Sequence, residues 1–158
     1  MPTISPPKQE RVSLTPVHEN DAEELVALRI EAMRDSLMQI DRFDPDRARA
    51  RFLSGFCPER TRHIDTDGKR VGFVVVQPQA DTLLLDHLYI RPGSQGRHIG
   101  SLVLARIIEE ANSQGLPVRV GALRGSDSNR FYLRHGFTLV GQQEFDNYYL
   151  RPCGEAHE

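Results

Sequence analysis

Two ionisable side chains that could move a proton stand next to each other in an apolar run. Asp86 and His87 lie within Leu83–Ile90, whose composition predicts a buried β-strand. A carboxylate or an imidazole can accept a proton from a substrate. Because successive side chains of a strand point to opposite faces, we expect only one of the two to face a substrate cleft. The other is expected to bond a neighbouring loop or to lie in the core, and alternation alone does not assign them.

A loop of small and polar residues, Ser94–His98, separates this strand from a helical pattern at Ile99–Glu110. Strand, loop and helix in this order aim backbone N–H groups of the helix N-terminus at an anion. Arg97 adds a charged donor in the same loop. We therefore expect residues 95–101 to hold a phosphate-bearing ligand. The chain has no G-x-x-x-x-G-K-S/T sequence and no G-x-G-x-x-G after its first strand, so neither a P-loop nor a Rossmann dinucleotide site is expected.

Two stretches resemble the motifs of one enzyme family. Residues 95–100 read Q-G-R-H-I-G and resemble motif A of the GNAT N-acetyltransferase superfamily, R/Q-x-x-G-x-G/A, with His98 where the family prefers glycine. The preceding L-Y-I-R-P, Leu88–Pro92, resembles the strand end of that motif. Residues 126–137, S-D-S-N-R-F-Y-L-R-H-G-F, resemble the family's late motif, and the order and spacing of the two motifs agree. The chain is similar to this family over nearly its whole length.

The resemblance implies a single domain at residues 10–152, between a flexible tail at 1–9 and a second tail at 153–158. The implied fold class is α/β (α+β): a GNAT fold with a mixed, mostly antiparallel sheet of about six to seven strands and about four flanking helices. In this fold the central strand and the strand that follows it splay apart at their ends. The acetyl-pantetheine arm of the co-substrate would lie in that split.

Caps and turn residues predict the separate elements. Asn20 is expected to cap a helix that ends near residue 36, and the Asp44-Pro45 pair opens a second helix. An Asp67-Gly68 turn joins two strands, and the run at 71–76 is too apolar for an edge strand. The other expected elements are strands at 11–17, on an edge, and at 118–123, 138–144 and 148–151, and helices at 99–110 and 126–135.

The resemblance also implies how acetyl-CoA would be held. The backbone of Leu88, Tyr89 and Ile90 would pair with the pantetheine amides as an added strand does. The pyrophosphate would be held by the backbone amides of Gln95, Gly96, Arg97, His98, Ile99, Gly100 and Ser101. Asn129 is a candidate hydrogen-bond partner for the cofactor arm, and the equally weighted alternative is a polar residue in the first turn of a helix.

The same resemblance assigns an acid and suggests a base. Tyr132 occupies the family's general-acid position, and a phenol with a pKa near ~10 is protonated at neutral pH and can reprotonate a thiolate. Many family members carry an acid near Asp86, so we favour Asp86 over His87 as the base. Direct proton transfer and transfer through a water molecule both remain open.

The first two helices and the last hairpin shape the acceptor site in this fold. The expected substrate residues are Arg29, Met33, Phe43 and Tyr148, with Arg34, Arg124 and Tyr149 as further candidates. Several arginines indicate a carboxylate-bearing amine. Arg47, Arg49 and Arg51 are interpreted as a solvated basic face rather than as an anion site.

The leading hypothesis is an acetyl-CoA-dependent N-acetyltransferase in which a small or amino-acid-like primary amine attacks directly in a ternary complex. One alternative is acetylation of a protein or peptide at lysine or at the N-terminus. Another is a non-catalytic CoA-binding sensor or interaction module, which the departure at His98 would suit. A homodimer is possible for the fold.

Composition narrows the partners further. The chain has 158 residues and a formal net charge of −2, which argues against a nucleic-acid or membrane-surface partner. No apolar run approaches the ~20 residues of a membrane span, and the N-terminus lacks the apolar region of a signal peptide, so we expect a cytoplasmic protein. The two cysteines and six histidines show no ligand spacing, and no metal site is expected.

Overall fold

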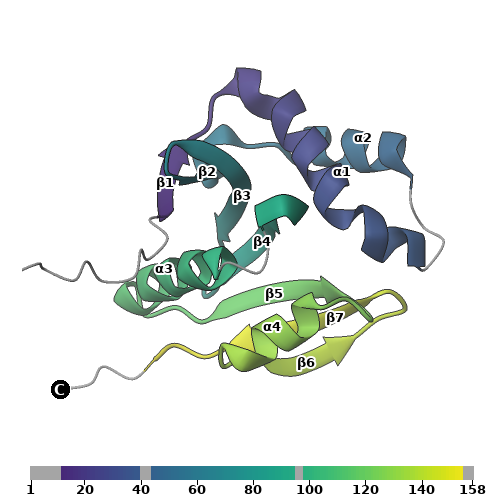
Figure 1. The fold of residues 1–158 in the computed structure, drawn as a ribbon. Helices are drawn as coiled ribbons and strands as arrows, with labels where there is room; N and C mark the ends of the chain where they lie inside the picture. The colour runs from purple at the N-terminus through teal and green to yellow at the C-terminus, as the bar shows by residue number, and fades with distance from the viewer. Residues whose placement is uncertain (1–11, 40–43, 95–97, 155–158) are drawn as a thin grey trace, which may run out of the picture.

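The computed structural model describes residues 12–39, 44–94 and 98–154 (Figure 1). Its regular elements, in chain order, are β1 (Val12–Pro16), α1 (Ala22–Gln39), α2 (Pro45–Gly55), β2 (Thr61–Thr66), β3 (Lys69–Pro78), β4 (Leu83–Ile90), α3 (Ile99–Ser113), β5 (Val118–Leu123), α4 (Ser128–Arg134), β6 (Thr138–Gln142) and β7 (Asp146–Arg151). Short 3-10 turns lie at Glu19–Asp21, Pro58–Arg60 and Pro92–Ser94.

The seven strands form one sheet in the order β1-β2-β3-β4-β5-β7-β6. Every neighbouring pair is antiparallel except β4 and β5, which are parallel. A parallel pair needs a crossover connection, and α3 supplies it. The predicted mixed, mostly antiparallel sheet is therefore confirmed, and its single parallel junction lies near the middle.

Helices cover both faces of the sheet. One core cluster joins α3 and α4 to the sheet, and its fully buried members include Val103, Leu104 and Ile107 of α3. A second cluster joins α1 and α2 to the other face through Leu25, Phe52 and other apolar residues. Burying apolar surface on both faces is the main stabilising term for such a layered fold.

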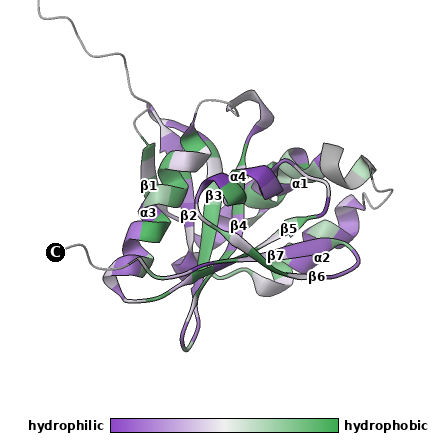
Figure 2. Cartoon of the chain, turned by 90° about the horizontal axis from the view of Figure 1, so that it is seen from below, coloured by the Kyte–Doolittle hydropathy of each residue, from purple (hydrophilic) through white to green (hydrophobic). Residues whose placement is uncertain are grey.

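The strand β3 carries the most continuous hydrophobic run, and it is drawn in green in Figure 2. Phe73 and Val75 contribute to the cluster under α1 and α2, whereas Val74 and Val76 contribute to the cluster under α3. Both faces of β3 are buried, so its central position is as predicted. The first strand, which ends at Pro16, lies on an edge, also as predicted.

The tight turn between β2 and β3 has the predicted residues. Asp67 has a φ of 49° and Gly68 a φ of 80°, the left-handed pair that a two-residue hairpin turn requires. The start of α2 is also as predicted, because the Asp44 carboxylate accepts a hydrogen bond from the Arg47 N–H at 3.1 Å.

The predicted cap of the first helix is wrong. A 3-10 turn, Glu19–Asp21, precedes α1, and Asp21 rather than Asn20 is the residue directly before the helix. Asp21 Oδ2 accepts a hydrogen bond from the His18 N–H at 2.9 Å and lies 3.0 Å from Nε2 of the buried His63. His63 on β2 is far from Asp21 in the sequence, and capping preferences alone do not predict such a contact. The first helix also extends to Gln39, beyond the predicted end near residue 36.

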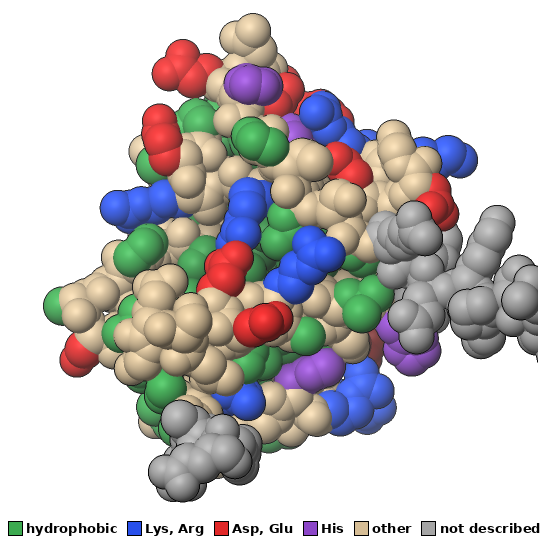
Figure 3. Space-filling model, turned by 90° about the vertical axis from the view of Figure 1, so that its left-hand side faces the viewer, with side chains coloured by type: hydrophobic (Ala, Val, Ile, Leu, Met, Phe, Trp, Pro, Cys, Tyr) green, Lys and Arg blue, Asp and Glu red, His purple; other side chains and the backbone are tan. Residues whose placement is uncertain are grey.

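Within the described residues, no helix is long and apolar enough to cross a membrane. Cationic and anionic side chains are interspersed on the face seen in Figure 3. No group of three or more candidate ligand side chains in the described part of the chain could hold a metal ion.

Candidate active site

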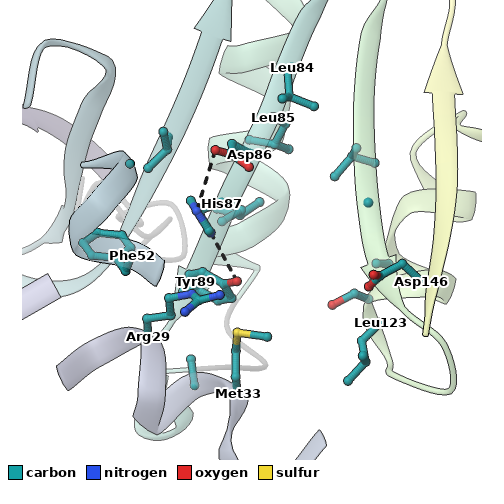
Figure 4. A pocket seen from close by; sticks show the side chains of 18 of the residues that line it. Arg29, Met33, Phe52, Leu84, Leu85, Asp86, His87, Tyr89, Leu123 and Asp146 are labelled. Carbon is teal, nitrogen blue, oxygen red and sulfur yellow. Dashed lines mark hydrogen bonds and ion pairs between the residues drawn. The ribbon is translucent and has the colours of Figure 1, made fainter. Parts of the chain in front are cut away.

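The parallel junction of the sheet is short and opens into a cavity. Leu83, Leu84 and Leu85 of β4 pair with Val118, Arg119 and Val120 of β5. Both strands continue beyond these pairs without further pairing between them, which confirms the predicted splay. A cavity of about 1080 Å³ lies at the split and is lined by β4, β5, α1, α2 and residues near β7 (Figure 4).

A β-bulge in β4 changes which side chains face this cavity. Val75 pairs with His87 and Val76 pairs with Leu85, which leaves Asp86 as the extra residue. A bulge interrupts the alternation of side chains along a strand. Asp86 and His87 consequently both line the cavity, with Asp86 Oδ2 3.7 Å from His87 Nε2. The prediction that only one of them faces the cleft is therefore wrong.

The imidazole of His87 is held among aromatic rings. Its centroid lies 5.8 Å from that of Phe52, 6.3 Å from that of Phe73 and 5.5 Å from that of Tyr89. Burial lowers the pKa of His87 from 6.5 to about 4, against the opposing effect of the Asp86 carboxylate. His87 is therefore neutral at pH 7. Its Nδ1 atom lies 3.3 Å from the Tyr89 hydroxyl (Figure 4).

The Asp86 carboxylate lies nearer to solvent than His87. Its side chain is 36% exposed, whereas that of His87 is 20% exposed. The Gln77 side-chain amide donates a 2.6 Å hydrogen bond to Asp86 Oδ2. Asp86 is thus fixed on one side by β3 and open to water on another.

Arg29 of α1 brings a guanidinium to the same wall of the cavity, beside Tyr89 and Met33 (Figure 4). Its Nη1 atom donates a 3.0 Å hydrogen bond to the Ala48 carbonyl of α2. Its Nε atom is buried and has no hydrogen-bond partner among the described residues. A buried N–H without a partner is costly, so this atom is suited to bind an anionic or carbonyl group of a ligand.

Tyr132 of α4 lies on the other side of the split. Its ring contacts Phe131, Phe137 and Tyr149, and the residue is 6% exposed. Burial raises the pKa of the Tyr132 phenol above its ordinary value of 10, so the hydroxyl stays protonated across the physiological range. The residue lines the cavity.

The side chain of Asn129 is held by hydrogen bonds to residues of the protein. Its Nδ2 atom donates to the carbonyls of Leu123 and Ser126, both at 2.9 Å. Its Oδ1 atom accepts from the Tyr149 hydroxyl at 2.7 Å and from the Asn147 amide at 2.8 Å. These bonds fix the start of α4 against β5 and β7, and contact with a cofactor stays a prediction.

The N-terminus of α3 begins at an unusual backbone angle. His98 has a φ of 62°, in the left-handed region, and its side chain makes no capping bond. This conformation explains why motif A prefers glycine at this position. Gly100 faces Phe131, and Ser101 Oγ lies 3.1 Å from His135 Nε2. Gln95, Gly96 and Arg97 lie outside the described residues.

Only some of the expected acceptor residues line the cavity. Arg29, Met33 and Tyr148 line the cavity, as does Tyr149, whereas Arg34 and Arg124 do not, and Phe43 lies outside the described residues. Arg49 pairs with Glu23 on the surface, but Arg47 and Arg51 line the cavity. All three residues are exposed, which agrees with the interpretation as a solvated face, and Arg47 and Arg51 lie where α2 borders the split.

Sequence reasoning missed several side chains of the site. It considered only the backbone of Tyr89, whereas the hydroxyl bonds to His87. It did not propose Gln77, Phe52 or Asp146, all of which line the cavity. Gln77 could have been found as the polar end of an otherwise apolar strand.

Comparisons with known proteins agree with the geometry. The acetyltransferase (GNAT) domain family matches residues 59–139. A [ribosomal protein bS18]-alanine N-acetyltransferase from Haemophilus influenzae is 33% identical over 85 residues, 53% of this chain and 57% of that protein. The chain thus covers little more than half of that relative's length.

Solved structures show the same fold. The PaiA N-acetyltransferase of Thermoplasma acidophilum, solved in complex with coenzyme A, has a TM-score of 0.70 at 16% identity over 90% of this chain and 99% of that one. The ribosomal-protein-S18-alanine N-acetyltransferase of Escherichia coli has a TM-score of 0.67 at 17% identity over 94% and 97%. At these identities the likeness concerns the fold alone.

Proposed function

The chain belongs to the GNAT acetyltransferase family, and we propose that it transfers an acetyl group from acetyl-CoA directly to a primary amine in a ternary complex. The observation that carries this proposal is the split between β4 and β5. It lies at the single parallel junction of the sheet and brings Asp86, His87 and Tyr132 to one cavity. These are a carboxylate, a neutral imidazole and a protonated phenol, the groups that proton removal and proton return require.

The described residues fit acetyl-CoA at two places. Beyond Leu85, β4 has no pairing with β5, so the backbone at Leu88 and Tyr89 can pair with an extended amide-bearing ligand. The first N–H groups of α3, from Ile99 to Ser101, lack partners within the helix and can bind phosphate oxygens. When bound, acetyl-CoA supplies the activated acetyl group as a thioester.

Different side chains of the cavity would donate and accept the protons of the reaction. Tyr132 would donate its proton to the departing thiolate, and burial supports this assignment because it keeps the phenol protonated. Asp86 is the proposed final proton acceptor, since its carboxylate is open to solvent while His87 is neutral and enclosed. A backbone N–H near Leu88 would stabilise the developing negative charge on the acetyl oxygen, worth about 3–4 kcal/mol in a dry site.

Arg29 supports a small acceptor that carries a carboxylate beside its amine. Its buried Nε has no partner among the described residues, and Met33 beside it offers an apolar surface. A bidentate guanidinium–carboxylate contact would orient such an acceptor with its amine toward β4.

A peptide N-terminus is the second candidate acceptor. Two of the similar proteins are named as S18-alanine N-acetyltransferases, and their printed acceptor is a protein. A peptide α-amine has a carbonyl, not a carboxylate, on the adjacent carbon. The two acceptor classes therefore differ in what they would offer to Arg29.

The test is thiol release from acetyl-CoA over a panel of amino acids, their amides, polyamines and peptides that begin with alanine. We expect amine-dependent release, and a fall of about 100-fold in kcat for Tyr132→Phe. Arg29→Gln should raise the KM of an amino acid but leave that of its amide nearly unchanged. Preference for peptides over all amino acids would favour the protein acceptor, and acetyl-CoA binding without release to any amine would favour the non-catalytic module.

A further inference from the structure

We propose that the acceptor amine loses its proton through a relay of side chains along β4, from the Tyr89 hydroxyl through His87 to Asp86. The relay rests on the proposed acetyl transfer and adds Tyr89 as a catalytic residue that contacts the amine. His87 and Asp86 act through it. All three side chains line the cavity (Figure 4).

The distances give the relay a direction. The Tyr89 hydroxyl lies 3.3 Å from His87 Nδ1, and His87 Nε2 lies 3.7 Å from Asp86 Oδ2. One imidazole tautomer suits this order: Nδ1 accepts from the phenol and Nε2 carries the hydrogen that faces the carboxylate. The second distance exceeds a hydrogen bond, so the ring must rotate slightly toward Asp86 before that proton moves.

The β-bulge is what makes the relay possible. In a regular strand Asp86 would face away from His87 and Tyr89. The extra residue at Asp86 turns its carboxylate toward the cavity side of β4. Gln77 on β3 then holds Asp86 Oδ2 at 2.6 Å.

Charged groups on the surrounding elements favour passage of the proton rather than its retention on His87. Burial opposes a positive imidazole most strongly, Asp86 favours it, and Arg29 of α1 and Arg51 of α2 oppose it further. Burial raises the pKa of the Tyr89 phenol, the charge of Arg29 and its hydrogen bond oppose this rise, and Asp86 and Asp146 add to it. Tyr132 lies close enough for its charge to interact with that of Tyr89. The neutral imidazole of His87 thus lies between the phenol of Tyr89 and the exposed carboxylate of Asp86 and can pass a proton from one to the other.

The transfers balance at every atom. The ammonium of the acceptor gives one proton to the Tyr89 oxygen as the Tyr89 hydroxyl proton moves to His87 Nδ1. The proton on His87 Nε2 moves to Asp86 Oδ2, and Asp86 releases one proton to water. The phenol and the imidazole stay neutral overall, and the amine becomes a neutral nucleophile. The starting tautomer is restored when His87 Nδ1 gives its proton to water and His87 Nε2 takes one from water.

The relay predicts a pH-dependent defect in Tyr89→Phe, which removes only the hydroxyl. We would measure kcat/KM from pH 6 to pH 10 with the panel amine that the wild type acetylates fastest. At pH 7 the variant should lose about 100-fold, because it must wait for the rare free amine. The loss should shrink steadily as the pH approaches the pKa of the amine, near ~10 for an alkylamine.

A second variant and a control keep the test decisive if Tyr89→Phe folds poorly. Asp86→Asn changes a partly exposed side chain and should give the same narrowing of the loss with pH. Tyr149→Phe removes a hydroxyl that bonds Asn129 instead of His87, and its ratio to wild type should be constant with pH. If the kcat/KM of Tyr89→Phe and of Asp86→Asn stayed below that of the wild type by a factor that does not change with pH, the relay would be overturned. Absence of transfer by the wild type to any amine would overturn the proposed function instead.

Discussion

At the scale of single residues, burial shifts the pKa values of an imidazole and a phenol of the cavity in opposite directions. It lowers the pKa of His87 to about 4 and raises the pKa of Tyr132 above 10. Both groups are consequently held in their neutral forms at pH 7. A neutral imidazole can accept one proton while it donates another, and a neutral phenol can protonate a thiolate. The enclosed aromatic surroundings of His87 thus set its chemistry as well as its position.

The lowered pKa of His87 predicts that the protein loses stability as the pH falls from 6.5 to 4. In the unfolded chain a histidine titrates near 6.5, so the unfolded state binds a proton in this window that the folded state does not. The free energy of unfolding should therefore fall by about 3 kcal/mol between pH 7 and pH 4. Denaturant melts across this range measure it, and His87→Gln should remove most of the fall.

Asp21 provides an internal check on that window. Hydrogen bonds from the His18 N–H and from His63 lower its pKa, so its stabilising contribution is present above its unfolded pKa near 3.8 and is lost only below that value. A fall above pH 4.5 that persists unchanged in His87→Gln would contradict the buried, neutral imidazole.

At the scale of elements, the strands and helices were largely predictable from the sequence, whereas the β-bulge in β4 was not predicted. Turn residues such as Asp67-Gly68 and apolar runs are local signals, and they predicted β3 and its neighbours. The bulge at Asp86 depends on how β4 pairs with β3, so alternation along β4 alone wrongly predicted that only one of Asp86 and His87 faces the cleft. The hydroxyl of Tyr89 could have been found from the sequence, because residues two apart on a strand share a face and Tyr89 is two residues from His87.

The start of α3 gives a prediction about backbone strain. A non-glycine residue in the left-handed region is strained, by about 1 kcal/mol or more, although histidine tolerates it better than most. His98→Gly should therefore stabilise the fold by up to about 1 kcal/mol, less the extra backbone entropy of glycine. It should also lower the KM for acetyl-CoA by allowing closer approach of the phosphates. Thermal melts and initial rates measure the two effects.

His98→Ala separates backbone relief from simple loss of the side chain. Alanine removes the imidazole but keeps the Cβ atom that disfavours a φ of 62°. It should be no more stable than the wild type. Equal gains from alanine and glycine would show that the side chain, and not the backbone angle, limits this position.

At the scale of the whole molecule, the resemblance of two short motifs was enough to predict the fold class and the family. The acceptor side could not be predicted in the same way. Arg29 faces the cavity because α1 packs on Ala48 of α2 and on the aromatic cluster beneath, a consequence of tertiary packing. Arg51 is exposed on α2 and also lines the cavity, a position that the helical pattern alone did not predict. Motifs record what a family binds in common, whereas the acceptor site depends on how the less typical elements pack.

Among the described strands, the two halves of the sheet are hydrogen-bonded to each other only by the short ladder between β4 and β5, so a ligand in the split should stabilise the whole molecule. At 100 times its Kd, acetyl-CoA should add about 2.7 kcal/mol to the free energy of unfolding. For a domain of this size that corresponds to a rise in Tm of about 5–10 °C. Adenosine 3′-phosphate 5′-diphosphate, which lacks the pantetheine arm, should raise the Tm less at the same multiple of the acetyl-CoA Kd, because it reaches α3 but not the split. Equal shifts from both ligands would mean that the arm does not bind between β4 and β5.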